Sequence, residues 1–208
     1  MSTAACDTDT TTEKRGAIES LESLSASVAA YVDENPEKGP AVRASMDYHL
    51  GIVEQNAGDH EAANRLFRQV SECDLPTEDS SRYIWALAKL ALAQNFYDGL
   101  GVEKDEKRCF ELTVEAAAHG QEPIAQYRLG VFYANAVGVE RDLGLAADWT
   151  LKAASAGHEL AQLQMIRICG QGLGVVADAD KAKEWAGKAG RTAQAQAKLL
   201  LAEFVGED

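Results

Sequence analysis

The chain has 208 residues and a formal net charge of −13, and 46% of its residues are hydrophobic. An acidic surface repels nucleic acid and anionic membranes, so neither is expected as a partner, whereas a basic protein partner is allowed. The hydrophobic content suits one ordinary domain or a short repeat array, and because no apolar run of about 20 residues occurs, no membrane span is expected.

The first 16 residues, MSTAACDTDTTTEKRG, are polar and lack the apolar core of a secretion signal. We therefore predict a disordered head over residues 1–16 and a cytoplasmic location. No Cys-x-x-Cys pair occurs among the four cysteines, Cys6, Cys73, Cys109 and Cys169. Cys109 and Cys169 fall at apolar positions of predicted helices, which favours buried free thiols in a reducing compartment.

Residues 17–83 predict one helix followed by a helical hairpin. The apolar face of the first helix is formed by Ile18, Leu21, Val28 and Tyr31, and DENPEKGP then ends this helix. The next stretch resembles a tetratricopeptide repeat at Leu50, Gly51, Ala63, Phe67 and Pro76. Asp59, in the short turn AGDHEAA, is expected to cap the second helix of this hairpin.

Three Gly-Val turns recur at Gly101, Gly138 and Gly174, which are 37 and 36 residues apart. An alanine stands 13 residues before each glycine (Ala88, Ala125 and Ala161), and an aspartate four residues after it (Asp105, Asp142 and Asp178). A phosphate-binding loop is normally built once, whereas a turn that every unit of an array needs recurs. The glycine-rich stretch GQGLGVVAD is therefore interpreted as a turn between helices and not as a nucleotide site.

The register predicts two helices in each unit. The glycine is expected to close the first helix in the left-handed conformation, and the following valine to hold the turn against the core. The aspartate is expected to cap the second helix by accepting an unpaired N–H. Small residues such as Ala93 and Gly130 would let the paired helices approach closely. The equivalent residues Leu112, Trp149 and Trp185 are expected to pack in the core and not to bind a ligand.

The pattern A-x-x-x-L-G-x-x-Y…G-V-x-x-D…A-x-x-W-x-x-K-A-A-x-x-G-H resembles the Sel-one-like repeat (SLR), a longer relative of the tetratricopeptide repeat. The middle unit matches best, and the third departs at Ile166 and Cys169, which stand where Gly130 and Tyr133 do. The resemblance covers residues 84–208 and implies an all-α chain, an α-solenoid of stacked antiparallel helical hairpins with three SLR units. The final AQAKLLLAEFV resembles a first helix without its partner, which is typical of a capping helix.

No catalytic, cofactor-binding or metal-binding residue is predicted. HELAQ begins like the zinc-protease motif but ends in Gln162, so the second ligand is missing. His158 stands at the Gly-His position of the repeat and is interpreted as structural. The other histidines, His49, His60 and His119, are not grouped with a metal-ligand set, and neither G-x-S-x-G nor a Walker motif occurs.

The first helices of stacked hairpins line a concave surface. The resemblance places polar and aromatic side chains there, and Tyr and Arg are frequent anchors at protein interfaces. The candidate partner-binding residues are Tyr48, Gln55, Asn56, Gln94, Tyr97, Asp98, Tyr127, Asn135, Arg167 and Gln171, with Ile52, Val131 and Leu163 on the same face. The alternative is that several of these side chains pack between repeats.

The resemblance implies a non-catalytic scaffold or adaptor that binds a partner protein or peptide on its concave face. It would need no cofactor and would be a monomer or a weak dimer. A second interpretation is an acidic inhibitor, immunity protein or chaperone that masks a basic partner. A third, of another class, is an SLR-type hydrolase; such enzymes are typically secreted and rich in paired cysteines, and neither feature is expected of this chain.

Overall fold

The computed structural model describes residues 26–36, 38–73, 78–119 and 122–204. The head expected over residues 1–16 lies outside the described residues, as do Ile18 and Leu21 of the first expected helix and Pro76 of the hairpin. Within the described part of the chain, all regular structure is helical. The first helix ends at Glu34, within the segment DENPEKGP that was predicted to end it.

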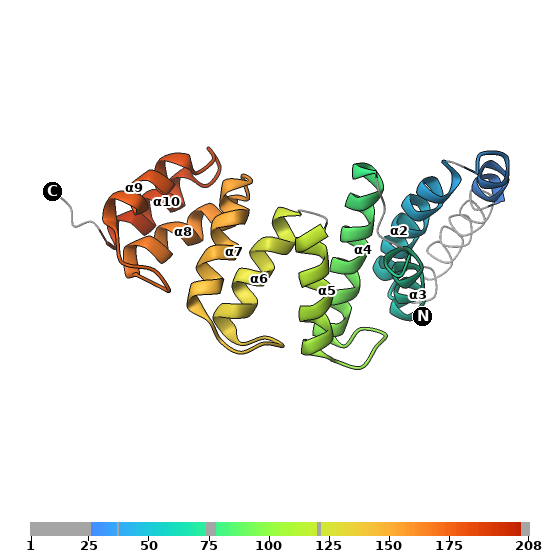
Figure 1. Ribbon diagram of the computed structural model, residues 1–208, viewed down its shortest axis with the longest axis horizontal. Coiled ribbons are helices and arrows are strands. Elements are labelled where there is room, and N and C mark those ends of the chain that lie inside the picture. Colours follow the sequence, from blue (N-terminus) through green and yellow to red (C-terminus); the bar gives the residue numbers. More distant parts are fainter. Residues whose placement is uncertain (1–25, 37, 74–77, 120–121, 205–208) are drawn as a thin grey trace, which may run out of the picture.

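The helices follow one another in chain order along the long axis of the molecule, from α2 to α10 (Figure 1). Each helix packs mainly on its neighbours in the sequence, so the chain is an α-solenoid, as predicted. The bounds of the helices are α2 (Gly39–Ala57), α3 (His60–Ser71), α4 (Asp79–Asp98), α5 (Glu106–His119), α6 (Pro123–Asn135), α7 (Leu143–Ser155), α8 (Glu159–Gln171), α9 (Ala179–Lys188) and α10 (Gln194–Ala202).

An aspartate precedes the second helix of every unit and caps it, as predicted. Its Oδ1 accepts the backbone N–H three residues further on, at 2.9 to 3.0 Å, which satisfies one of the unpaired donors of the helix N-terminus. The capping residues are Asp59, Asp105, Asp142 and Asp178. A contact of such short range depends on local sequence alone, which explains why it was predictable.

The residue that closes each first helix is not the glycine of the Gly-Val pair. The closing residues lie two positions earlier and are Gly99, Ala136 and Gly172, with φ of 73°, 59° and 72°. Ala136 is the non-glycine residue with positive φ in the described part of the chain. An alanine in this conformation costs about 1–2 kcal/mol relative to the right-handed region, so the surrounding turn must hold it there.

The glycine of each Gly-Val pair also has a positive φ, but its main role is to permit contact with the preceding unit. A Cβ atom at Gly101, Gly138 or Gly174 would overlap backbone atoms at the start of that unit's second helix. The residues that would be overlapped are His60, Glu106 and Leu143, respectively. These glycines therefore let each turn lie against the unit before it.

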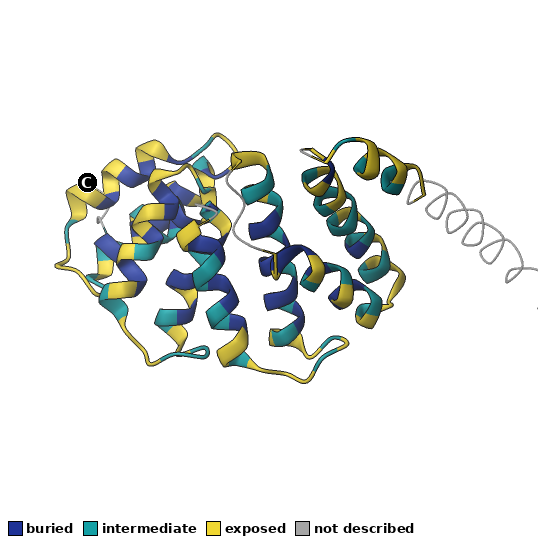
Figure 2. Cartoon of the chain, turned by 45° about the vertical axis from the view of Figure 1, so that its right-hand side comes forward, coloured by how far each residue is buried: buried dark blue, intermediate teal, exposed yellow. Residues whose placement is uncertain are grey.

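Buried residues lie where neighbouring helices face each other (Figure 2). The alanines of the repeat register, Ala88, Ala125 and Ala161, are all 0% exposed, as their spacing predicted. A Cβ at Gly130 would overlap the Thr150 hydroxyl, so close approach of α6 and α7 requires glycine there. In the third unit, Ile166 occupies the equivalent position and is itself fully buried.

Two apolar side chains are less buried than predicted. Trp149 was expected in the core together with Leu112 and Trp185, which are buried, but it is half-buried. The Lys152 ammonium lies 3.8 Å from the centre of the Trp149 ring and shields its outer face. Val175 was expected to hold its turn against the core and is instead 41% exposed.

Candidate partner-binding surface

The predicted partner-binding residues all lie on α2, α4, α6 and α8, the first helices of their hairpins. We call the surface formed by these four helices the first-helix face. Six of the candidates are exposed: Asn56, Tyr97, Asp98, Asn135, Arg167 and Gln171. Four are partly buried: Tyr48, Gln55, Gln94 and Tyr127.

Three aromatic candidates are engaged in packing. The Tyr48 ring lies 6.0 Å from that of Phe67, the Tyr97 ring is stacked on Phe132 at 6.5 Å, and the Tyr127 ring is stacked on His158 at 4.8 Å. Leu163 is 6% exposed and belongs to the core, so its expected place on the surface was wrong. Leu163 therefore packs between repeats, as the alternative interpretation had it. The three aromatic candidates pack on neighbouring rings with only part of their surface.

Two polar candidates are held by neighbours one helical turn away. The amide of Gln94 donates to the Asp98 carboxylate at 2.6 Å. The Asn135 amide donates to the Val131 carbonyl at 2.8 Å, which fixes its side chain and leaves Oδ1 to accept.

One cleft on the first-helix face brings predicted residues together. It has a volume of about 220 Å³ and is lined by residues of α6, α7 and α8 and of the turn after α8. The predicted residues in it are Tyr127, Val131 and Asn135; it is also lined by Gly130, Ala134, Leu143, Ala146, Ala147, Thr150, Gln164, Ile168 and Leu173. We call it the α6–α8 cleft. Sequence reasoning missed the contributions from α7 and α8, although their small side chains were a visible signal.

A second hollow of about 640 Å³ lies between α7, the end of α8, the following turn and α9. Its lining includes Leu151, Cys169 and Trp185, together with Val175 and Val176 of the turn. Val176 is 89% exposed. Nothing in the sequence interpretation singled out this site.

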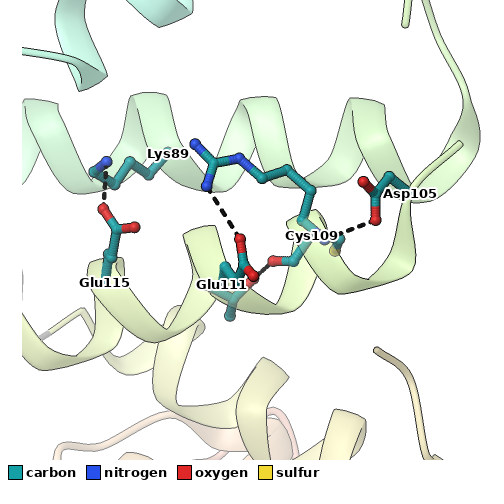
Figure 3. A network of polar contacts seen from close by, with 7 residues as sticks. Lys89, Asp105, Cys109, Glu111 and Glu115 are labelled. Atoms are coloured by element: carbon teal, nitrogen blue, oxygen red, sulfur yellow. Dashed lines mark hydrogen bonds and ion pairs between the residues drawn. The ribbon is translucent and has the colours of Figure 1, made fainter. Parts of the chain in front are cut away.

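Buried polar side chains elsewhere hold helices together. Lys89 of α4 is 6% exposed, and its ammonium lies 2.7 Å from the Glu115 carboxylate of α5 (Figure 3). Asn95 donates to the buried Asn64 side chain at 2.7 Å and so joins α4 to α3. The fold tolerates the buried Lys89 charge because an opposite charge lies next to it. Removal of that partner would leave an unpaired buried charge and destabilise the folded state.

The Cys109 thiol is packed in the core, and the His158 imidazole caps a helix. Burial raises the pKa of Cys109 to about 11, which disfavours the nucleophilic thiolate. His158 precedes α8, and its Nδ1 accepts the Ala161 N–H at 3.2 Å. Among the described residues, no group of three His, Cys, Asp or Glu side chains is arranged to hold a metal ion. Those residues also contain no helix long and apolar enough to cross a membrane.

The negative charge is concentrated in one half of the chain. Residues 1–122 contain 23 Asp and Glu against 11 Lys and Arg, whereas residues 123–208 contain 10 against 9. The lining of the α6–α8 cleft includes no charged residue. Electrostatic attraction of a basic partner would therefore act through the N-terminal half and not through the cleft.

The hairpins α4–α5, α6–α7 and α8–α9 coincide with three matches to the Sel1 repeat, at residues 86–121, 123–158 and 159–191. The chain belongs to the Sel1 repeat family. The resemblance predicted from the sequence is thus confirmed, and Sel1 repeats typically mediate protein interactions.

Solved structures show the same fold as this Sel1 repeat protein. One is a Sel1 repeat protein from Oxalobacter formigenes, with 23% identity and a TM-score of 0.62 over 72% of this chain and 60% of the other. Another is a protective antigen present in uropathogenic Escherichia coli strains, with 22% identity and a TM-score of 0.64 over 77% of this chain and 33% of the other. The chain thus spans between a third and three fifths of the length of these proteins. A comparison with curated proteins gives no significant match.

Proposed function

We propose that this Sel1 repeat protein is a non-catalytic scaffold that binds a segment of a partner protein along the first-helix face, which we take as the concave side of the solenoid. The observation that carries the proposal is the α6–α8 cleft, where Tyr127, Val131 and Asn135 surround one depression. Arg167 and Gln171 are exposed on the same face, on α8. An aromatic-lined depression beside an exposed arginine is a common composition for an interface centre.

The proposal includes no catalytic role, a two-part organisation and a reducing compartment such as the cytoplasm. Buried thiols and a helix-capping histidine support the first point, because these groups are already engaged in packing and capping. Residues 17–83 would form the tetratricopeptide-like part and residues 84–208 the SLR part. The free thiols of Cys73, Cys109 and Cys169 suit a reducing compartment.

A second candidate function is the masking of a basic partner by an acidic inhibitor or chaperone. The excess of 23 acidic over 11 basic residues in residues 1–122 favours it. In that case the partner would contact the N-terminal half, and its binding would weaken steeply as salt is added.

The test begins with a photo-cross-linking amino acid placed at Val131, on the first-helix face, and at Leu145, which is 40% exposed on α7, the second helix of its hairpin. A partner of the first-helix face should be cross-linked from position 131 and not from position 145. That protein is then produced and its affinity measured by surface plasmon resonance.

The affinity measurement compares two variants, each of which removes one exposed positive charge. Arg167→Ala should weaken binding about 30-fold, the loss of one interface anchor of about 2 kcal/mol. Lys183→Ala removes an exposed charge on α9, the second helix of its hairpin and so outside the first-helix face, and should leave binding unchanged. Equal affinities of both variants would refute the first-helix face as the binding surface, and strong salt dependence with no effect of Arg167→Ala would favour the masking function.

A further inference from the structure

The α6–α8 cleft is open because side chains that are large in the preceding unit are smaller here. We call the space between consecutive first helices an interval: the cleft lies in the α6–α8 interval, and the α4–α6 interval precedes it. The two intervals are related by the 37- and 36-residue repeat, so each residue that lines the cleft has an equivalent one unit earlier. The larger residue stands in the earlier unit in these four pairs: Tyr97 and Ala134, Phe110 and Ala147, Arg128 and Gln164, and Phe132 and Ile168. The reverse holds at Tyr127 and Leu173, which stand where Leu90 and Val137 do. Three aromatic rings are thus replaced by smaller aliphatic side chains in a single interval.

The preceding interval shows what fills such a space when the large residues are present. The Tyr97 and Phe132 rings stack at 6.5 Å, at the positions equivalent to Ala134 and Ile168 of the cleft. Arg128 reaches back to donate to the Leu90 carbonyl at 3.4 Å. The material missing from the α6–α8 cleft is therefore mainly aromatic.

The size of the cleft suits one side chain. Small-molecule sites usually measure about 300–1,000 Å³, so at about 220 Å³ the cleft is small for a metabolite. A cavity of about 150 Å³ holds a benzene ring. One aromatic side chain of a partner would thus fit.

The lining also determines the polarity of the occupant. Because none of the lining residues is charged, an ionised side chain buried there would lose its hydration without gaining a counter-charge. The Asn135 Oδ1 remains an acceptor, since the amide nitrogen is bonded to Val131. The Tyr127 ring in the wall offers an edge or a face to a second ring. A neutral aromatic group that carries a donor satisfies all three conditions.

We propose that the α6–α8 cleft is a specificity pocket for a single tyrosine side chain in the bound segment of the partner. The proposal rests on the function proposed above and names the residue type that the first-helix face selects. The tyrosine ring takes the place of the aromatic rings of the preceding interval, and its hydroxyl donates to Asn135 Oδ1.

The test uses capped amino acids as probes, followed by NMR of the full chain. N-acetyl-tyrosinamide should shift the methyl signals of Val131, Ala134, Ala147 and Ile168 in a saturable way. N-acetyl-phenylalaninamide should bind about three- to tenfold more weakly, because it lacks the hydroxyl donor. N-acetyl-leucinamide and N-acetyl-argininamide should bind more weakly still. Equal binding of the tyrosine and leucine probes, or shifts centred on Val176, would overturn the proposal.

Three variants make the assignment specific. Ala134→Tyr restores the residue of the preceding unit, whose ring stacks on the equivalent of Ile168, so it should fill the cleft and weaken N-acetyl-tyrosinamide binding at least about tenfold. Asn135→Ala, which adds no bulk, should reduce the tyrosine probe to the affinity of the phenylalanine probe and leave the latter unchanged. Cys169→Tyr restores the residue of the preceding unit in the other hollow and should leave both probes unaffected. Tyrosine binding that survives both Ala134→Tyr and Asn135→Ala contradicts the pocket.

The outcome is separable from that of the proposed function. If the partner is still cross-linked from position 131 and still depends on Arg167, but no capped tyrosine binds, the first-helix face is the binding surface and the tyrosine pocket is wrong. If the tyrosine probe binds as described but the partner is insensitive to Arg167→Ala and is not cross-linked from position 131, the pocket exists and the proposed binding surface is wrong.

Discussion

At the scale of single residues, His158 joins a helix cap to the first-helix face. Its Nδ1 accepts the Ala161 N–H, and its ring is stacked on Tyr127 at 4.8 Å. Burial lowers the pKa of His158, with smaller opposing effects from Glu122 and Glu159. Neutral imidazole is therefore the form that the fold favours, which agrees with its role as an acceptor.

This arrangement makes the stability of the chain depend on pH in the acidic range. Because the pKa of His158 is lower in the folded state than the unfolded value of about 6.5, the unfolded chain binds the proton more readily. The contribution is present above the unfolded pKa and is lost as the pH falls below it. His158→Asn caps without titrating, so its melting temperature should fall less than that of the parent between about pH 7.5 and 5. An identical decrease in calorimetry would contradict the capping role.

The thiols provide a second prediction at this scale. Burial raises the pKa of Cys109 to about 11 and also raises that of Cys169, whereas Cys73 is exposed. In a Cys6→Ser variant at about pH 8, one thiol should react rapidly with a chromogenic disulfide reagent, and it should be Cys73. Cys109 and Cys169 should react only after denaturant is added. Three fast thiols in the native protein would show that the two helices open readily.

At the scale of elements, the turn glycines differ in what surrounds them. Gly58 and Gly138 both have positive φ, 88° and 65°. A Cβ at Gly58 would have no neighbour within 4 Å, whereas a Cβ at Gly138 would overlap the Glu106 carbonyl oxygen of the preceding unit. Backbone conformation and contact between units can therefore be separated by one pair of variants.

Gly58→Ala should cost about 1–2 kcal/mol, the price of the left-handed conformation alone. Gly138→Ala should cost about 3 kcal/mol or more, because the turn must also move away from α5. The free energies of unfolding are measured by urea denaturation, with circular dichroism to confirm the helical content. Equal costs would mean that the turn is not held against the preceding unit.

At the scale of the whole molecule, packing is dominated by neighbours in the chain. The helix α8 packs on α7, α9 and α10, whereas α2 packs on α3 and α4. In such an array, stability is approximately a sum of unit and nearest-neighbour terms, so a local loss stays local.

Trp185→Ala tests this locality. Trp185 in α9 is 8% exposed, and replacing a large buried side chain by alanine typically costs about 3–5 kcal/mol. Amide hydrogen exchange should accelerate in α8, α9 and α10 and remain unchanged in α2, α3 and α4. A uniform acceleration along the chain would show instead that the array unfolds as one cooperative unit.

The sequence by itself determined the features that depend on short-range contacts and on repetition. The spacing of Gly101, Gly138 and Gly174 indicated the helical hairpins, and the aspartate caps act over three residues, so both could be predicted. The alanines of the register are buried because a repeated position meets a repeated environment. The first-helix location of the candidate binding residues followed from the same register.

Only the tertiary structure decided how the side chains of different units share space. Ala136, and not Gly138, closes α6, and Gly138 lies where the turn meets α5. Leu163 is buried although its register position suggested the surface, and Trp149 is half-buried although its equivalents are core residues. The α6–α8 cleft is formed by side chains from three helices, so its volume depends on their combined packing. A repeat register predicts which positions are equivalent, but the space at a position is set by the neighbours that the fold brings to it.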